Sequence, residues 1–246
     1  MLVLDGAMGT AIQNCNLGPA DFGGADYEGC NEFLVLTRPQ VIGSIHEAYL
    51  QAGADILETN TFGGTPLVLN EYQLGHRAYE MNKAAAELAR SLADKYSTAS
   101  KPRFVAGSIG PTTKAISVTG GITFAELVEQ FYQQVRALYD GGVDYFLLET
   151  CQDTRNIKAG LLACERLFRE VKPIPVAISG TIEPMGTMLA GQTVDALYAA
   201  VSHVELLYIG LNCATGPEFM TDHIRTLAEL SRFPVSCVPN AGLPDT

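Results

Sequence analysis

Positive charge is scarce in this sequence of 246 residues, where 16 Lys and Arg stand against 27 Asp and Glu and give a formal net charge of −11. Such a surface lacks the clustered cations that displace counterions from nucleic acid, which argues against sequence-independent nucleic-acid binding. The same deficit disfavours an anionic membrane surface. No apolar run approaches the ~20 residues of a membrane-spanning helix. We therefore expect neither nucleic acid nor a membrane as a partner.

Cysteine-pairing motifs and a secretion signal are missing as well. The six cysteines are scattered without a CxxC pair, which is not the pattern of a disulfide framework. The opening residues MLVLDG lack the basic segment and apolar run of a secretory signal. We therefore predict a cytoplasmic protein with reduced thiols. The composition, 47% hydrophobic and only 17% charged, indicates a folded chain with a large core.

Short apolar segments alternate with helix-like segments along the chain. The apolar segments are continuous, which is typical of parallel strands buried on both faces. The seven predicted strands are 1–5, 54–60, 103–108, 144–150, 175–181, 206–212 and 233–239. Helix signals, such as Pro39 at a first helical position and the capping-box spacing of Thr123 and Glu126, predict the intervening helices. These helices are 39–52, 78–97, 123–142, 156–171, 193–202 and 217–231.

Repeated strand–helix units predict a parallel sheet, for which two closures compete. In a doubly wound sheet that binds a dinucleotide, the first strand would be followed by GxGxxG and by an acidic residue for the ribose. The sequence has GAMGT there, so we favour an α/β fold of the (β/α)8 TIM-barrel type. A closed barrel needs eight strands, and only seven are counted before Thr246. We expect residues 1–246 to form one barrel domain, a fragment with units one to seven and with strand/helix unit eight missing.

Candidate site residues lie at the C-terminal ends of the predicted strands, where such barrels build their active sites. Glycines and small polar residues gather at these ends and favour a cavity for a small polar ligand, although each segment alone fits ordinary turn chemistry. Asp5 and Glu149 each close an apolar strand, where an unpaired carboxylate is costly. They could receive a ligand's ammonium group, pair with a basic side chain, or act as general acid and base.

Cys213 ends the sixth predicted strand, where a single cysteine is usually a small buried apolar residue. A zinc site needs further nitrogen or sulfur ligands, and neither HExxH nor CxxC occurs. Cys151 and Cys237 also fall near strand ends and could approach it. We interpret the four histidines, which lie on or near predicted helices, as packing or surface residues. Lys114 is in a loop, which makes Schiff-base chemistry a weak alternative.

An ordered set of motifs, spread over essentially the whole chain, resembles one known family. The motifs are LDGAMGT, CNEFLVLTRPQVI, AYLQAGADILETNTFGGT, GSIGPT, FLLET, GLNCATGP and VPNAGLP. Together they are similar to the homocysteine S-methyltransferase family. Within it, NEFLVLTRPQVI most resembles the N-terminal homocysteine-binding module of cobalamin-dependent methionine synthase. The resemblance implies a barrel that transfers a methyl group to the thiol of homocysteine, giving methionine in amino-acid biosynthesis.

The resemblance also implies how the substrate is held. In the family, the acidic residue of the first-strand DG motif and the Glu that ends strand four hold the amino group of homocysteine, and these are Asp5 and Glu149 here. Backbone groups of the following turn receive the substrate carboxylate, which in this chain are those of Gly6, Ala7 and Met8. Apart from the metal site, the resemblance implies no catalytic residue.

The resemblance implies that two of the three zinc ligands, and the domain that holds the methyl donor, lie outside residues 1–246. Cys213 would be one of three thiolate ligands of Zn²⁺, with Asn240 beside the metal. The other two family ligands are adjacent cysteines of a GGCCG motif on strand eight, beyond Thr246. The resemblance implies methylcobalamin as the methyl donor and a longer protein that also has a folate-binding domain. Because no DxHxxG-like pattern for cobalamin occurs here, cobalamin would be held by a separate domain.

Three alternatives stay open. The first is a homocysteine methyltransferase that uses S-methylmethionine or another small methyl donor. The second is a metal-free lyase or hydrolase in which Asp5 and Glu149 act as acid and base. The third is a non-catalytic fragment that binds a ligand or serves as a scaffold.

Overall fold

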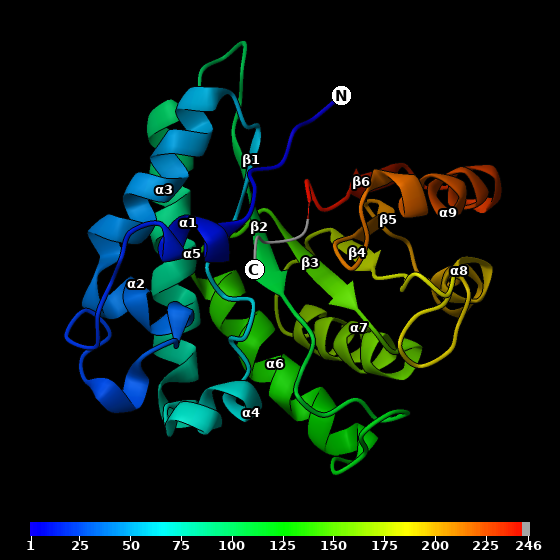
Figure 1. The fold of residues 1–246 in the computed structure, drawn as a ribbon, viewed down its shortest axis with the longest axis horizontal. Coiled ribbons are helices and arrows are strands. Elements are labelled where there is room, and N and C mark those ends of the chain that lie inside the picture. The colour runs from blue at the N-terminus through cyan, green and yellow to red at the C-terminus, as the bar shows by residue number, and fades with distance from the viewer. Residues whose placement is uncertain (243–246) are drawn as a thin grey trace. The chain divides into compact units, whose positions relative to one another are not determined.

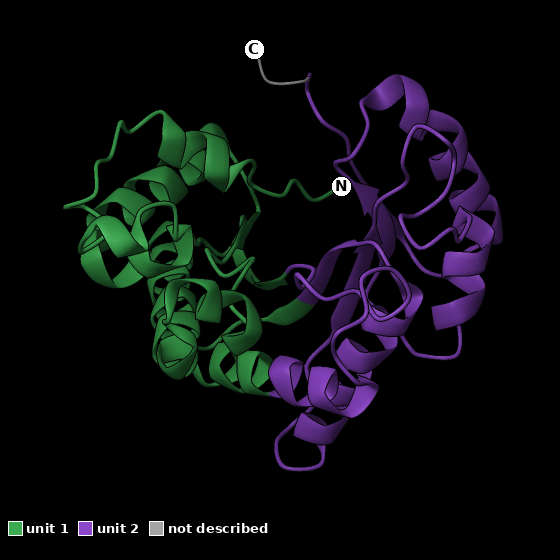
Figure 2. Ribbon diagram, turned by 60° about the horizontal axis from the view of Figure 1, so that its bottom comes forward, with its two compact units in different colours: residues 1–109, 133–146 green, residues 110–132, 147–246 purple. Residues whose placement is uncertain are grey.

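The computed structural model describes residues 1–242, and Figure 1 shows its ribbon. Thr246, the predicted boundary of the seventh unit, lies outside the described residues. The chain divides into two compact units, coloured separately in Figure 2. By residue number they are 1–109 with 133–146 for unit 1, and 110–132 with 147–246 for unit 2.

The strands form a sheet in which they follow one another in chain order. In the described residues they are β1 (Ile56–Glu58), β2 (Phe104–Ile109), β3 (Tyr145–Cys151), β4 (Val176–Gly180), β5 (Ile209–Asn212) and β6 (Val235–Val238). In unit 1, β1 pairs in parallel with β2, and in unit 2, β5 pairs in parallel with both β4 and β6. The predicted α/β class with a parallel sheet is therefore confirmed and fits part of a TIM barrel, whereas the count of eight units stays a prediction.

The longer predicted helices are all present within residues 1–242, with ends that follow their local signals. Pro39 opens one of them, and Gly53 closes it in the left-handed conformation with φ 112°. The Thr123 backbone N–H donates to Glu126 Oε2 at 2.8 Å, and the Glu126 N–H donates to Thr123 Oγ1 at 3.2 Å, as a capping box requires. These helices are α3 (Pro39–Ala52), α5 (Ala78–Tyr96), α6 (Phe124–Asp140), α7 (Thr154–Phe168), α8 (Val194–Val201) and α9 (Pro217–Leu230).

Three short helices that the sequence pattern did not indicate lie in unit 1: α1 (Met8–Gln13), α2 (Leu34–Thr37) and α4 (Pro66–Leu69). They help to cover a core in which α3 and α5 pack together. The buried face of α5 is rich in alanine and includes Ala85, Ala86, Ala89 and Ala93. Small side chains of this kind let a neighbouring helix approach closely. No helix in residues 1–242 combines the length and apolarity needed to cross a membrane.

The first predicted strand is the main error in the expected fold. Residues 1–5 make a single parallel bridge, from Leu4 to Ile56, instead of a strand. Two carboxylates end the pairing, because Asp5 Oδ1 takes the backbone N–H of Glu58 and Asp55 Oδ2 takes that of Val3. Side chains that bond to nearby backbone in this way compete with the ladder. The apolar run MLVL predicts a strand, but its flanking Asp residues shorten it.

Candidate functional site

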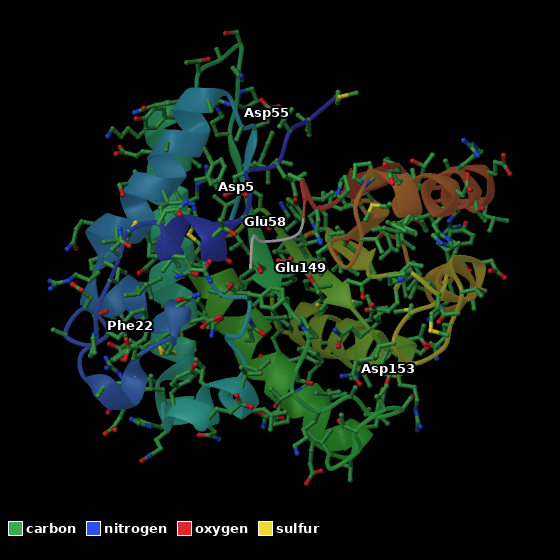
Figure 3. The ribbon with its side chains drawn as sticks, viewed as in Figure 1. Asp5, Phe22, Asp55, Glu58, Glu149 and Asp153 are labelled. Atoms are coloured by element: carbon green, nitrogen blue, oxygen red, sulfur yellow. The ribbon has the colours of Figure 1, made fainter. Side chains whose placement is uncertain are left out.

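Asp5 is held at the end of the Leu4 bridge with its side chain only 2% exposed. Its Oδ1 accepts a hydrogen bond from the Glu58 N–H at 3.0 Å, and Figure 3 shows the two residues together. Its Oδ2 lies 3.7 Å from Nδ1 of His46 on α3. Burial raises the pKa of Asp5, while His46 and the Glu58 N–H act in the opposite direction. Asp5 is thus a buried carboxylate with one firm hydrogen bond.

The turn after Asp5 presents its backbone to solvent. Gly6 and Ala7 are exposed, and Met8 begins α1, where the first N–H groups of a helix have no intrahelical acceptor. A Cβ on Gly6 would come within 3.1 Å of the Tyr49 hydroxyl oxygen, so a larger residue there would require the Tyr49 side chain to shift. The geometry leaves backbone N–H groups of the turn available to an anionic group.

The polar residues that follow β1 are used internally. The hydroxyls of Thr59 and Thr61 lie 2.6 Å apart, and Thr61 Oγ1 donates to the Ser108 carbonyl at 2.7 Å. Gln134 Nε2 donates to the Thr61 carbonyl at 2.7 Å. Asn60 Nδ2 donates to the Asn31 carbonyl at 2.8 Å. Buried polar groups need hydrogen-bond partners, and these residues find them within the chain. The polar residues after β1 therefore fit ordinary turn chemistry and not a ligand site.

Glu149 and Thr150 are the two residues before Cys151, the last residue of β3, and lie in unit 2. Glu149 is 9% exposed, and Thr150 Oγ1 lies 3.4 Å from its Oε2. Thr150 has φ +53°, a left-handed conformation that is strained for a β-branched residue. The Thr150 N–H donates to Asn212 Oδ1 at 3.0 Å. A costly backbone conformation therefore brings the threonine hydroxyl beside the glutamate.

Asn212, the last residue of β5, connects three strand ends through its carboxamide. Its Oδ1 accepts from the Thr150 N–H and, at 2.6 Å, from Ser179 Oγ on β4. Its Nδ2 donates to Thr150 Oγ1 at 2.8 Å and lies 3.4 Å from Cys213 Sγ. Both ends of the amide are occupied, so it fixes the ends of β3, β4 and β5. This role does not follow from the sequence pattern, although the motif GLNC places an amide directly before Cys213.

Cys213 follows β5 with φ +43° and is partly exposed. Its Sγ lies 3.7 Å from Thr150 Oγ1, and its backbone N–H donates to the Val238 carbonyl at 3.0 Å. Burial is the main cause that raises the pKa of the thiol, and Glu149 adds to it. Asn240 lies after β6, and its N–H donates to the Thr215 carbonyl at 3.1 Å, in the turn after Cys213.

The other two cysteines near strand ends contact groups other than Cys213. Cys237 Sγ lies 3.8 Å from the sulfur of Met220 on α9. Cys151 Sγ lies 3.7 Å from the Glu149 carbonyl oxygen, and burial raises the pKa of the Cys151 thiol. Across residues 1–242, no three His, Cys, Asp or Glu side chains come together in a group able to hold a metal ion.

Comparison with known proteins gives two findings. The family model described as homocysteine S-methyltransferase matches residues 2–246. The fold is similar to crystal structures of the homocysteine methyltransferase MmuM from Escherichia coli. The metallated form has a TM-score of 0.82 at 23% identity, over 98% of this chain and 84% of that one. The oxidized form has a TM-score of 0.81 at 23% identity, over 98% and 83%.

Proposed function

This chain belongs to the homocysteine S-methyltransferase family, and on that premise we propose that it binds homocysteine and presents the thiol for methylation to methionine. The likeness to MmuM shows the fold, and the family shows the type of enzyme. The roles of individual residues are our proposal. We also propose that residues 1–246, with their two compact units, act as one homocysteine-binding domain.

The state of Asp5 carries the proposal for substrate binding. In the described part of the chain, no Lys or Arg lies within ion-pair distance of this buried carboxylate. The ionisable side chain that faces it is His46. This disfavours the alternative in which Asp5 serves a structural salt bridge. A buried carboxylate without a cation is costly, and an ammonium group that binds to it relieves that cost. We assign the amino group of homocysteine to Asp5, with Glu149 as the second carboxylate.

The substrate carboxylate would bind to the turn that follows Asp5. Gly6, Ala7 and Met8 present backbone there, and the turn adjoins Asp5 in sequence. Recognition of the two charged groups at neighbouring positions fixes the direction in which the substrate side chain leaves the turn. Such orientation is what a transfer reaction needs from a binding site.

Zinc is the cofactor that we propose, with Cys213 as the ligand from the described residues. Thiolate sulfur suits Zn²⁺, and Cys213 is a partly exposed residue whose Sγ has only long polar contacts to Asn212 and Thr150. A catalytic zinc site needs about three protein ligands, and residues 1–242 offer no such group. The described residues therefore do not fit a complete zinc site. What they do is bind and orient the amino acid.

The methyl donor stays a prediction that rests on the stretch NEFLVLTRPQVI. In the structure this stretch contributes to the core, since Leu34, Val35 and Ile42 are buried, and Glu32 accepts a hydrogen bond from the Gly63 N–H. We propose methylcobalamin, held by another domain of a longer protein with a folate-binding domain beside it. Methyl transfer to homocysteine, measured separately with methylcobalamin and S-methylmethionine, distinguishes the two donors.

Calorimetric titration with homocysteine tests the proposed binding site. We expect Asp5→Asn and Glu149→Gln each to weaken binding about 10- to 100-fold, because each removes a carboxylate that pairs with the ammonium. Asp222→Asn, at an exposed position on α9, is the matched control and should bind as the unaltered protein does. Unchanged affinity in Asp5→Asn would remove Asp5 from the site.

A further inference from the structure

His46 is a buried histidine whose ring has no hydrogen-bond partner. Its side chain is fully buried on α3, and neither Nδ1 nor Nε2 has a partner within the described residues. Burial of such a polar group without a compensating hydrogen bond lowers the stability of the folded state. Buried unsatisfied groups are rare in folded proteins, so each one calls for a physical explanation.

The direction in which His46 points gives that explanation. Its Nδ1 faces Asp5 Oδ2 at 3.7 Å, about 0.7 Å longer than an ordinary N–H···O hydrogen bond of about 3.0 Å. The other oxygen, Oδ1, is bound by the Glu58 N–H, and the Asp5 N–H donates to the Ile56 carbonyl at 2.8 Å. The backbone and one oxygen of Asp5 are fixed in this way. His46 is the group that faces the remaining oxygen, Oδ2.

α3 keeps the imidazole in that place. Ile42, Ile45 and Leu50 are buried on the same helix, which packs against α5. The ring therefore cannot turn to solvent without loss of core packing. A displacement of less than 1 Å would be enough to close the contact with Oδ2.

We infer that His46 is a positioning residue for Asp5, whose Nδ1–H holds Oδ2 in the orientation that receives the amino group of homocysteine. This inference rests on the proposed role of Asp5 and adds a second residue to it. An imidazole can donate one N–H while it is uncharged. A Lys or Arg in its place would neutralise the carboxylate and compete with the substrate ammonium. An imidazole Nδ1–H directed at Oδ2 fixes that oxygen and leaves its other lone pair for the ligand.

Three substitutions of His46 separate positioning from packing. His46→Asn keeps an amide N–H at the place of Nδ1, His46→Gln moves the amide one carbon further, and His46→Leu has no donor. We expect His46→Leu and His46→Gln to weaken homocysteine binding about tenfold, the value of one hydrogen bond to a charged group. His46→Asn should restore affinity to within about threefold of the unaltered protein. Calorimetric titration of the full protein measures these affinities.

A substrate analogue distinguishes loss of positioning from general damage. 4-Sulfanylbutanoate is homocysteine without its amino group, so it makes no ammonium contact with Asp5. Its affinity should be the same, within about twofold, in all three variants and in the unaltered protein. In an Asp5→Asn background, His46→Leu should cause no further loss of homocysteine affinity, because residues that act as one unit are not additive.

Each outcome supports or overturns the inference. It is overturned if His46→Leu binds homocysteine as tightly as the unaltered protein, or if homocysteine and 4-sulfanylbutanoate are weakened equally. Should His46→Leu fail to fold, equal affinities of His46→Asn and His46→Gln overturn it. Full affinity in Asp5→Asn contradicts the proposed function itself. Loss in Asp5→Asn without loss in His46→Leu contradicts only the role of His46.

Discussion

Asn212 in unit 2 and His46 in unit 1 are both polar side chains beside a residue that we assign to the substrate or the metal. Asn212 bonds through both ends of its amide, to Thr150 and Ser179, whereas neither nitrogen of His46 has a hydrogen-bond partner in residues 1–242. A satisfied network holds one geometry without a ligand, while an unsatisfied one leaves a cost that a ligand can remove. We therefore interpret the unit 2 strand ends as a preformed framework and the Asp5 cluster as a part completed by substrate.

The largest expected effect is loss of that framework in Asn212→Ala. The change removes two acceptor and two donor contacts and leaves the Thr150 N–H and Ser179 hydroxyl without their partner. We expect a loss of about 3 kcal/mol in the free energy of unfolding, measured with denaturant. Asn212→Asp keeps both acceptor contacts and should lose less. A loss below about 1 kcal/mol in Asn212→Ala would contradict the description of unit 2 as a framework held by this side chain.

In the absence of ligand, Asp5→Asn is expected to increase the free energy of unfolding, whereas Asn212→Ala decreases it. Burial raises the pKa of Asp5, so its favourable contribution to folding is present below its unfolded pKa and is lost as the pH rises through the folded pKa. At pH 7 the buried charge therefore opposes folding. Asn keeps an acceptor for the Glu58 N–H and avoids the charge, so we expect a gain on the order of 1 to 2 kcal/mol at pH 7.

Two measurements check this sign. The gain of Asp5→Asn should shrink as the pH falls through the raised pKa of folded Asp5 and vanish below about 4, where Asp is protonated in the unfolded chain as well. Saturating homocysteine should raise the melting temperature of the unaltered protein more than that of Asp5→Asn, because only the carboxylate pairs with the ammonium. A variant less stable than the unaltered protein at pH 7 would contradict the contrast between the two clusters.

The contrast also shows what the sequence can predict. The ends of α3 and α6 follow from Pro39, Gly53 and a capping box, all signals within a few residues. The strand predicted over residues 1–5 is reduced to a single bridge at Leu4, because side-chain hydrogen bonds of Asp5 and Asp55 end the pairing. The approach of His46 to Asp5 depends on how α3 packs beside β1, which no local pattern contains. A histidine on the apolar face with Ile42 and Ile45 was the available signal.

The site itself divides in the same way. That Asp5, Glu149 and Cys213 follow apolar segments is visible in the sequence, and the family resemblance gives each a proposed role. The left-handed backbone at Thr150 and Cys213 is not visible, because neither residue type favours it. Such strain persists only where surrounding contacts impose it. It is therefore a property of the completed framework around Asn212 and could not be predicted one residue at a time.

The smallest expected effect on stability comes from the strained left-handed backbone at Thr150. It tests at one position whether the Asn212 framework imposes that strain. Thr150→Gly and Thr150→Ala both remove the hydroxyl, but glycine adopts φ +53° freely and alanine does not. We expect the glycine variant to be more stable by about 1 kcal/mol. At Ser179, inside β4, the order should reverse, because glycine in a strand interior is less stable than alanine by about 0.5–1 kcal/mol. If alanine is better at both positions in denaturant unfolding, Thr150 is not held in a strained conformation by the Asn212 framework.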